Sequence, residues 1–212
     1  TSTTIGGFIW KIDIPIAIAA ILSGAMLSIA GTAMQCVLRN PLASPYTLGI
    51  SNAAAFGAAF SIIFLTGNMN AYSTPISAFV MAMVATGLII LLTKVTRVSS
   101  ETMVLAGIAI SAIFSAGMTL MQYIADPIQL SSIVTWTFGS VSHTNWKWDF
   151  VLLVVMLVAV LYFYPRRWDM NAMNAGDEVA KGLGVDTKRF LTVGMFMSAV
   201  ITAFVVSKFG VI

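Results

Sequence analysis

Residues 14–38 read IPIAIAAILSGAMLSIAGTAMQCVL and contain no charged side chain. A helix that crosses about 30 Å of hydrocarbon needs roughly 20 apolar residues, so this run predicts a membrane-spanning helix. The whole chain has the same character, since 58% of its 212 residues are hydrophobic and 9% are charged. A soluble domain carries about 25% charged residues. We therefore expect an all-α integral membrane protein, because the uncharged runs are too long for barrel strands and lack their alternation.

Further long apolar runs predict a polytopic helical bundle. The uncharged stretch 40–93 is too long for one helix and breaks naturally at 66–70. A moderately apolar stretch that begins at Pro127 and carries several hydroxyl side chains favours a short helix over 128–139 that does not span. The six predicted spans, all in one transmembrane domain over residues 1–212, cover 14–38, 46–66, 72–93, 102–125, 148–165 and 190–208.

The basic residues set the expected orientation, because short cytoplasmic loops are enriched in Lys and Arg. Such residues follow the first, third and fifth predicted spans, from Arg39 to the several basic residues of the 166–189 loop. The loops after the second and fourth spans have almost none. We therefore expect 166–189 on the cytoplasmic side and the 128–139 helix on the outer side.

Side chains that carry chemistry are scarce. No predicted span has an ionisable residue near its centre, which disfavours the main alternative class, an ion-coupled secondary transporter. The single cysteine, Cys36, and the single histidine, His143, predict no metal site and no catalytic constellation for an intramembrane enzyme. Asp126 suits a helix cap at the membrane interface. We expect a protein that is not an enzyme, binds no nucleic acid and holds no cofactor or metal of its own.

The first of two unusual stretches reads RNPLASP over 39–45 and continues as LGIS over 48–51. Each proline removes a hydrogen-bond donor and biases the residue before it away from helix. Asn40 suits a cap between the two flanking helices. The stretch therefore predicts a rigid turn after the first span.

The second unusual stretch reads NAGDEVAKGLGVD over 174–186, in the largest basic loop. Its two acidic residues, Asp177 and Glu178, suit the start of a short helix, and its glycines suit the end of that helix. Val179, Ala180 and Leu183 would form a small apolar face. Because such a face outside the membrane needs a partner surface, the stretch predicts a docking element.

The first stretch, together with the run GAMLSIAGTAMQ over 24–35, resembles the signature region of the FecCD-type permeases. Later runs, LAGIA over 105–109 and WTFGS over 136–140, are also similar to that family. These permeases belong to prokaryotic ABC transporters that import ferric siderophores, haem, cobalamin and related chelates. The resemblance implies a multi-pass cell-membrane subunit. The family's subunit has further spans, so the chain corresponds to its second to seventh spans, an incomplete permease domain.

The resemblance also implies partners. We expect a second permease subunit, identical or not, and two cytoplasmic ATPase subunits that carry ATP and Mg²⁺. An extracytoplasmic substrate-binding protein would dock outside, and lipid would surround the bundle. Ferric siderophore is the expected substrate, with haem, cobalamin and molybdate as alternatives.

Several residues take roles from the resemblance. The span 102–125 and the helix 128–139 would line the pathway, with Asn52, Met118 and Gln122 as candidates. The family commonly begins its second span with two arginines, where this chain has Asp13 and Ile16, so docking of the binding protein would involve Lys11 and Asp13 instead. The motif turn comprises Arg39, Asn40, Pro41, Leu42, Ala43, Pro45 and Gly49. The ATPase-coupling residues are Gly176, Asp177, Glu178, Val179, Ala180, Lys181, Leu183, Gly184 and Val185.

Overall fold

The computed structural model describes residues 6–65, 72–96 and 99–212, and this part of the chain folds into helices joined by short turns, with no strand. The fold-class prediction is thereby confirmed. The predicted break at 66–70 lies outside the described residues. The longer helices are α2 (Ile14–Leu38), α3 (Ile50–Phe64), α4 (Ser73–Thr96), α5 (Ser100–Ile124), α7 (Trp146–Phe163) and α10 (Thr187–Phe209). The shorter ones are η1 (Ile9–Asp13, a π-helix), α6 (Pro127–Phe138), η2 (Tyr164–Arg166, a 3-10 helix), α8 (Arg167–Asn174) and α9 (Asp177–Gly182).

Five of the described helices are long and apolar enough to cross a membrane, one fewer than the six spans expected. The difference lies at the predicted span 46–66. Its helix, α3, has 15 residues and is therefore about 22 Å long, which is less than the thickness of the hydrocarbon core. The chain before α3 forms turns and not helix, because Gly49 has a left-handed backbone. At the first span the helix extends further than expected, back to Gly6.

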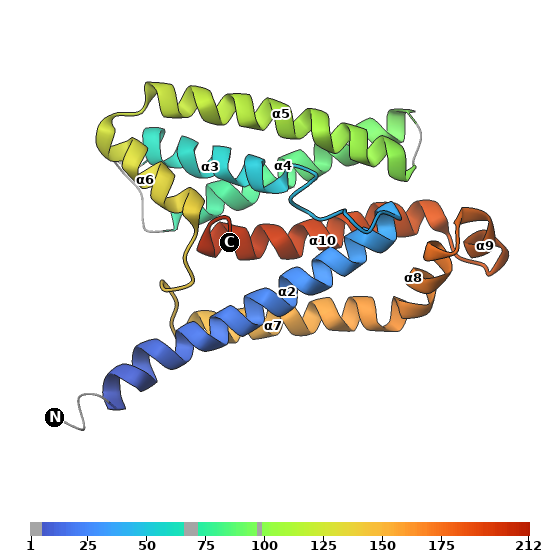
Figure 1. Ribbon diagram of the computed structural model, residues 1–212, viewed down its shortest axis with the longest axis horizontal. Coiled ribbons are helices and arrows are strands. Elements are labelled where there is room, and N and C mark those ends of the chain that lie inside the picture. The colour runs from blue at the N-terminus through green and yellow to red at the C-terminus, as the bar shows by residue number, and fades with distance from the viewer. Residues whose placement is uncertain (1–5, 66–71, 97–98) are drawn as a thin grey trace.

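Helix α10 lies in the middle of the bundle (Figure 1). Helices α3, α4 and α5 lie on one side of it, and α2 and α7 lie on the other. Buried residues of α10 belong to both large apolar clusters, one shared with α3, α4 and α5 and one shared with α2 and α7. In its most apolar stretch 67% of the residues are buried, against 22–33% for the other four membrane-length helices. The core of the described chain is therefore built around α10.

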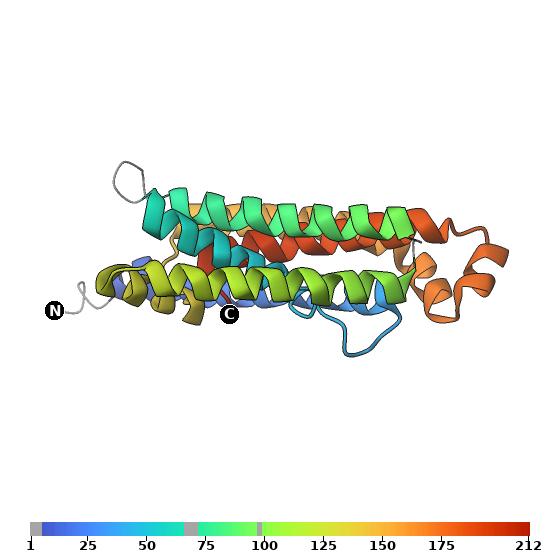
Figure 2. The ribbon, with the colours of Figure 1, turned by 90° about the horizontal axis from the view of Figure 1, so that it is seen from above.

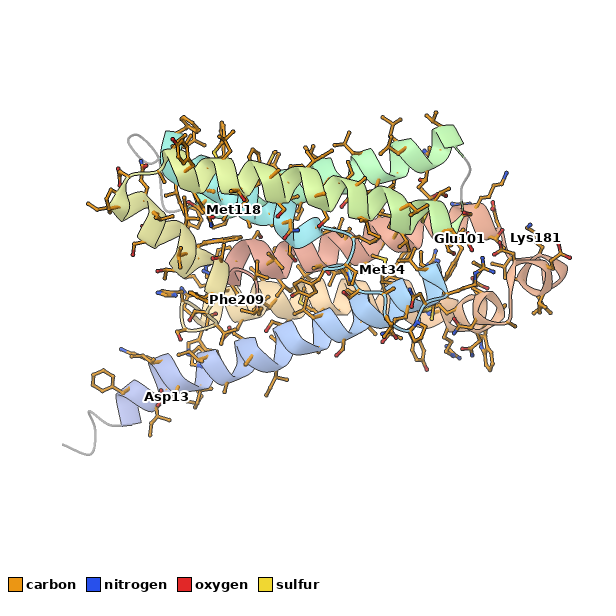
Figure 3. The ribbon with its side chains drawn as sticks, turned by 45° about the horizontal axis from the view of Figure 1, so that its top comes forward. Asp13, Met34, Glu101, Met118, Lys181 and Phe209 are labelled. Carbon is orange, nitrogen blue, oxygen red and sulfur yellow. The ribbon has the colours of Figure 1, made fainter. Side chains whose placement is uncertain are left out.

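The two ends of the bundle differ in charge. Figure 3 shows Glu101 and Lys181 at the end that carries α8 and α9, and Asp13 and Phe209 toward the other end. The turn after α2, the segment between α7 and α10 and the first turn of α10 lie at the first end (Figure 1). Together they hold six of the eleven basic residues of the chain, Arg39, Arg166, Arg167, Lys181, Lys188 and Arg189. The predicted outer helix corresponds to α6, at the opposite end. The charge pattern thus places α8 and α9 at the end expected in the cytoplasm.

Local capping explains where several helices begin. Asp126 accepts hydrogen bonds from the backbone N–H groups of Ile128 and Gln129 and so caps α6, as expected of it. Pro127 follows at the first helical position, where its missing N–H costs nothing. Asn145 caps α7 in the same manner. The 166–189 loop contains α9, at the place where a short helix was expected, and also α8 and the first residues of α10.

Candidate functional site

The motif turn begins where α2 ends, at Arg39. Its backbone is left-handed, with φ 47° and ψ 39°, and Arg39 is the one non-glycine residue with a positive φ among those described. Glycine is the usual residue at this position, because a side chain there costs roughly 1 kcal/mol. Asn40 then accepts a hydrogen bond from the N–H of Leu42 through Oδ1 at 2.9 Å, which tightens the turn. A strained, non-glycine helix end indicates that the Arg39 side chain has a use.

The remainder of the turn packs against α5. Leu48 is buried, and its Cδ2 lies 2.5 Å from where a Cβ on Gly107 would be. Gly49 has φ 76°, and a Cβ there would lie 2.6 Å from the Cα of Ser111. Both glycines are therefore required by the close approach of the turn to α5. Figure 2 shows the segment between α2 and α3 leaving the end of α2 and returning into the bundle.

The second motif forms α9 and the turn that follows it. Asp177 and Glu178 occupy its first turn, where the helix dipole favours negative charge. The helix ends in a Schellman arrangement, in which the N–H of Gly184 binds the carbonyl of Lys181 and the N–H of Val185 binds that of Ala180. Gly184 supplies the positive φ of 85° that this ending needs.

The apolar face expected on α9 is divided between the core and the surface. Ala180 is fully buried in the main cluster, whereas Val179 is 48% exposed and Leu183 is 70% exposed. Ala180 therefore anchors the helix to the bundle. Val179 and Leu183, four residues apart, form an exposed apolar pair at the basic end of the molecule.

The structure brings the two motifs together, although 138 positions separate them. Nη2 of Arg39 donates to Oδ2 of Asp177 at 3.4 Å, between side chains that are 27% and 34% exposed. One helix turn earlier, the amide of Asn174 donates to Sγ of the buried Cys36 at 3.5 Å. A cavity of about 390 Å³ separates the two segments, lined by Thr32, Gln35, Cys36, Arg39, Asn40, Pro41 and Asn174.

The motif turn is also held at its other end. The hydroxyl of Tyr46 donates to the backbone carbonyl of Ile212 at 2.7 Å. Burial raises the pKa of Tyr46. A phenol is protonated at neutral pH even without this shift, so the hydroxyl is available as a donor. The 209–212 segment in turn lies against the end of α6.

Two glycines make the contact between α6 and the end of α10. The N–H of Ser140 binds the carbonyl of Phe209 at 2.7 Å. A Cβ on Gly210 would lie 2.8 Å from the Cα of Gly139 and would overlap the carbonyl oxygen of Trp136. Both glycines have positive φ, 67° and 80°. The backbones therefore touch without intervening side chains.

The three pathway candidates lie in or near helix contacts. Nδ2 of Asn52 donates to Oγ of Ser111 at 2.7 Å and so links α3 to α5. Met118 packs against a small cluster that includes Ile133 of α6, and Gln122 is partly buried nearby on α5. Asn52 and Met118 thus have packing roles. Asn commonly forms hydrogen bonds between membrane helices, and Met commonly fills gaps in helix packing.

A polar cavity of about 520 Å³ beside α6 contains residues that the sequence analysis did not select. Ser131, Ser132 and Thr135 share one face of α6 and line it, and the helical spacing of these hydroxyls was the available signal. Thr74, Ser140, His143 and Lys208 complete its polar lining. Among the described residues no group of His, Cys, Asp and Glu side chains could hold a metal ion.

Lys11 and Asp13, the docking candidates, are exposed in the π-helical segment at the end opposite α9. Beside them the ring of Trp10 packs against that of Trp146, with centroids 5.2 Å apart. Trp146 Nε1 also donates to the Trp10 carbonyl at 3.1 Å. Lys11 and Asp13 therefore lie in a helical segment that packs against the start of α7.

Comparison with known proteins identifies relatives over nearly the whole chain. The model of the FecCD transport family matches residues 2–212. A Methanocaldococcus jannaschii protein, itself only provisionally named an ABC transporter permease, is 44% identical over 214 residues. The match covers 96% of this chain and 61% of that protein. This chain therefore spans about three fifths of the length of that relative.

Two further relatives carry substrate names. The vitamin B12 import system permease of Pectobacterium atrosepticum is 29% identical over 97% of this chain and 61% of its own length. The Fe(3+)-citrate import system permease of Bacillus subtilis is 32% identical over 93% of this chain and 59% of its own length. A solved structure, described as an inward-facing conformation of a provisionally assigned metal-chelate type ABC transporter, matches with a TM-score of 0.86 at 27% identity. That match covers 97% of this chain and 67% of the other.

Proposed function

The chain belongs to the FecCD transport family, and from that premise we propose that it is part of the permease subunit of an ATP-driven importer. The observation that carries the proposal is α9. It lies outside the membrane-length helices, exposes an apolar pair, and is tied to the bundle through Ala180 and Asp177. ATP hydrolysis would belong to separate ATPase subunits that dock on this helix.

The exposed pair is suited to docking. Val179 and Leu183 project at the end of the molecule where the basic residues gather, and Lys181 lies between them. Burying a leucine side chain stabilises an interface by about 1.5–3 kcal/mol. Movement of a docked ATPase would be passed to α8 and α10 and would tilt the bundle between outward-open and inward-open arrangements.

Co-purification tests the docking face. The full-length protein is produced with its ATPase partner, and Val179→Asp and Leu183→Asp are compared with the wild type. Each variant is expected to weaken ATPase binding about tenfold or more, because the apolar contact is lost and a charge is placed in it. Lys188→Gln, an exposed change at the same end, is the matched control. Wild-type binding by both aspartate variants would show that α9 is not the docking element.

Energy coupling is tested by uptake into proteoliposomes. Uptake is expected only when the ATPase subunits and internal ATP are present. Uptake that persists without the ATPase would overturn the ABC assignment and favour an ion-coupled secondary transporter.

The substrate we propose is a ferric chelate, with a ferric siderophore as the preferred form. Support comes from the relative named for ferric citrate and from the metal-chelate transporter of similar structure. Cobalamin, haem and molybdate are the alternatives, and the B12-named relative favours the first of them. A binding assay with the cognate outer binding protein, offered ferrichrome, ferric citrate, cobalamin, haemin and molybdate, would decide among them.

The assembly we propose has two permease subunits, two ATPases and one outer binding protein. Asp13 stands where the family commonly has an arginine, so a non-identical permease partner is favoured. Charge reversal, Asp13→Arg, should change binding-protein affinity at low salt, where exposed charges are least screened. Unaltered affinity would remove Asp13 from the docking surface.

A further inference from the structure

We propose that the motif turn, residues 39–49, is a mechanical relay that connects α9 to α6, and that Arg39 and Tyr46 are its two attachment points. The proposal rests on the proposed function, because α9 is the helix that an ATPase would move. It assigns to two residues a positioning role that the family resemblance does not give them.

The attachment at Arg39 joins the relay to α9. Arg39 contacts Asp177, the first residue of α9, through the 3.4 Å contact between Nη2 and Oδ2. The other carboxylate oxygen of Asp177 is buried and has no hydrogen-bond partner among the described residues. The carboxylate is thus directed toward the turn and not toward the N–H groups of its own helix. A displacement of α9 would therefore act on Arg39 directly.

The left-handed backbone of Arg39 strengthens this assignment. A glycine would end α2 at this position without strain. A part-exposed ion pair contributes little stability, about 0–1 kcal/mol, so stability does not account for an arginine there. The arginine is instead explained if its side chain holds α9 and the turn in register.

The attachment at Tyr46 joins the relay to α6. The Tyr46 hydroxyl binds the carbonyl of Ile212, two residues after Gly210. The backbone of Gly210 touches that of Gly139, at the end of α6. Between the two attachments the turn is stiffened by Pro41 and Pro45. Just beyond Tyr46 it packs on α5 through Leu48, so residues 39–49 are suited to move as a unit.

The relay predicts that ATP binding changes the surroundings of α6. The reporter is Ser131→Cys, an exposed position on α6 that lines the polar cavity. The full-length transporter, assembled with its ATPases in lipid nanodiscs, is labelled with a maleimide with and without a non-hydrolysable ATP analogue. The same complex without Ser131→Cys gives the background labelling, to which the buried Cys36 of this chain contributes little. In the wild-type relay the analogue should change the labelling rate about fivefold or more.

Arg39→Gly and Tyr46→Phe should each abolish that change while ATPase co-purification stays at the wild-type level. Arg39→Gly removes the side chain and also relieves the left-handed strain, so misfolding does not explain its effect. If the two residues act in series, the double variant should be no worse than the worse single variant. Tyr164→Phe, which removes the hydroxyl of an exposed tyrosine outside residues 39–49, and Arg39→Lys, which keeps the charge, should retain the response.

The outcomes separate the relay from the proposed function. A wild-type complex that neither binds ATPase nor takes up substrate would overturn the proposed function. A working wild-type transporter in which Arg39→Gly and Tyr46→Phe respond normally to the analogue would overturn the relay alone. Effects of the two variants that multiply in the double variant would also overturn it, because they would show two independent routes.

Discussion

Replacement of Gly49 by alanine is a quantitative test of how the motif turn packs. The change adds a Cβ that would lie 2.6 Å from both Cα and Cβ of Ser111. It also places a side chain at φ 76°, where the left-handed backbone costs an L-residue about 1 kcal/mol. Overpacking of a tight contact costs a further 1–3 kcal/mol, roughly. We therefore expect a loss of about 2–4 kcal/mol in the free energy of unfolding.

The single buried cysteine supplies the assay. Cys36 is 8% exposed, so a thiol-reactive fluorogenic dye reports its exposure during thermal unfolding in detergent. For a chain of this size, 1 kcal/mol corresponds to roughly 2–4 °C in Tm. Gly49→Ala should therefore lower the apparent Tm by about 4–16 °C.

Gly87→Ala is the matched control, because it adds the same methyl group in open space on α4. A glycine in a helix interior costs about 0.5–1 kcal/mol relative to alanine, so this variant should be unchanged or slightly more stable. The reasoning fails if Gly49→Ala and Gly87→Ala unfold at the same temperature, since the turn would then have room to move away from α5.

Three further predictions concern single polar contacts. Asn52→Leu and Ser111→Ala each remove the hydrogen bond between α3 and α5, and each should lower the free energy of unfolding by about 0.5–1.5 kcal/mol. In the same thermal assay the double variant should be little less stable than either single variant. Asp126→Ala removes the cap of α6 and should cost about 1 kcal/mol and speed hydrogen exchange at the amides of Ile128 and Gln129, whereas Asp126→Asn should not. The tyrosinate absorbance that is lost in Tyr46→Phe should develop above the ordinary tyrosine pKa, because partial burial of Tyr46 favours the protonated phenol. A titration at or below the ordinary value would contradict this direction.

Features set by local chemistry were predictable from the sequence. The boundaries of α2 follow from an uncharged run with Arg39 at its end, and α6 follows from Asp126 and Pro127, a cap and a first-turn residue. Residues 177–182 form a helix because the acidic start and the glycine-rich end are encoded within a few residues. Hydropathy and capping act over short distances, so one sequence suffices to locate them.

Features set by distant packing were not predictable. The first residues of the predicted span 46–66 form a turn because Gly49 meets Ser111 across the bundle, which hydropathy does not record. Asn40 was expected to cap between the helices, yet the left-handed residue that ends α2 is Arg39. Its partner, Asp177, lies far along the chain, and the residue types alone do not indicate that Arg39 and Asp177 are in contact. The face of α6 that lines the polar cavity was overlooked because the other residues of that cavity come from distant parts of the chain.

The central position of α10 has a consequence for biosynthesis. Helices α2, α3, α4, α5 and α7 all precede it in the chain, yet α10 supplies buried residues to both large clusters. During translation the earlier helices enter the bilayer before their common neighbour exists, and each is stable there because its backbone is internally bonded. Final assembly must therefore wait for residues 187–209 to leave the ribosome, and until then the faces that α10 will cover are open to lipid or to insertion factors.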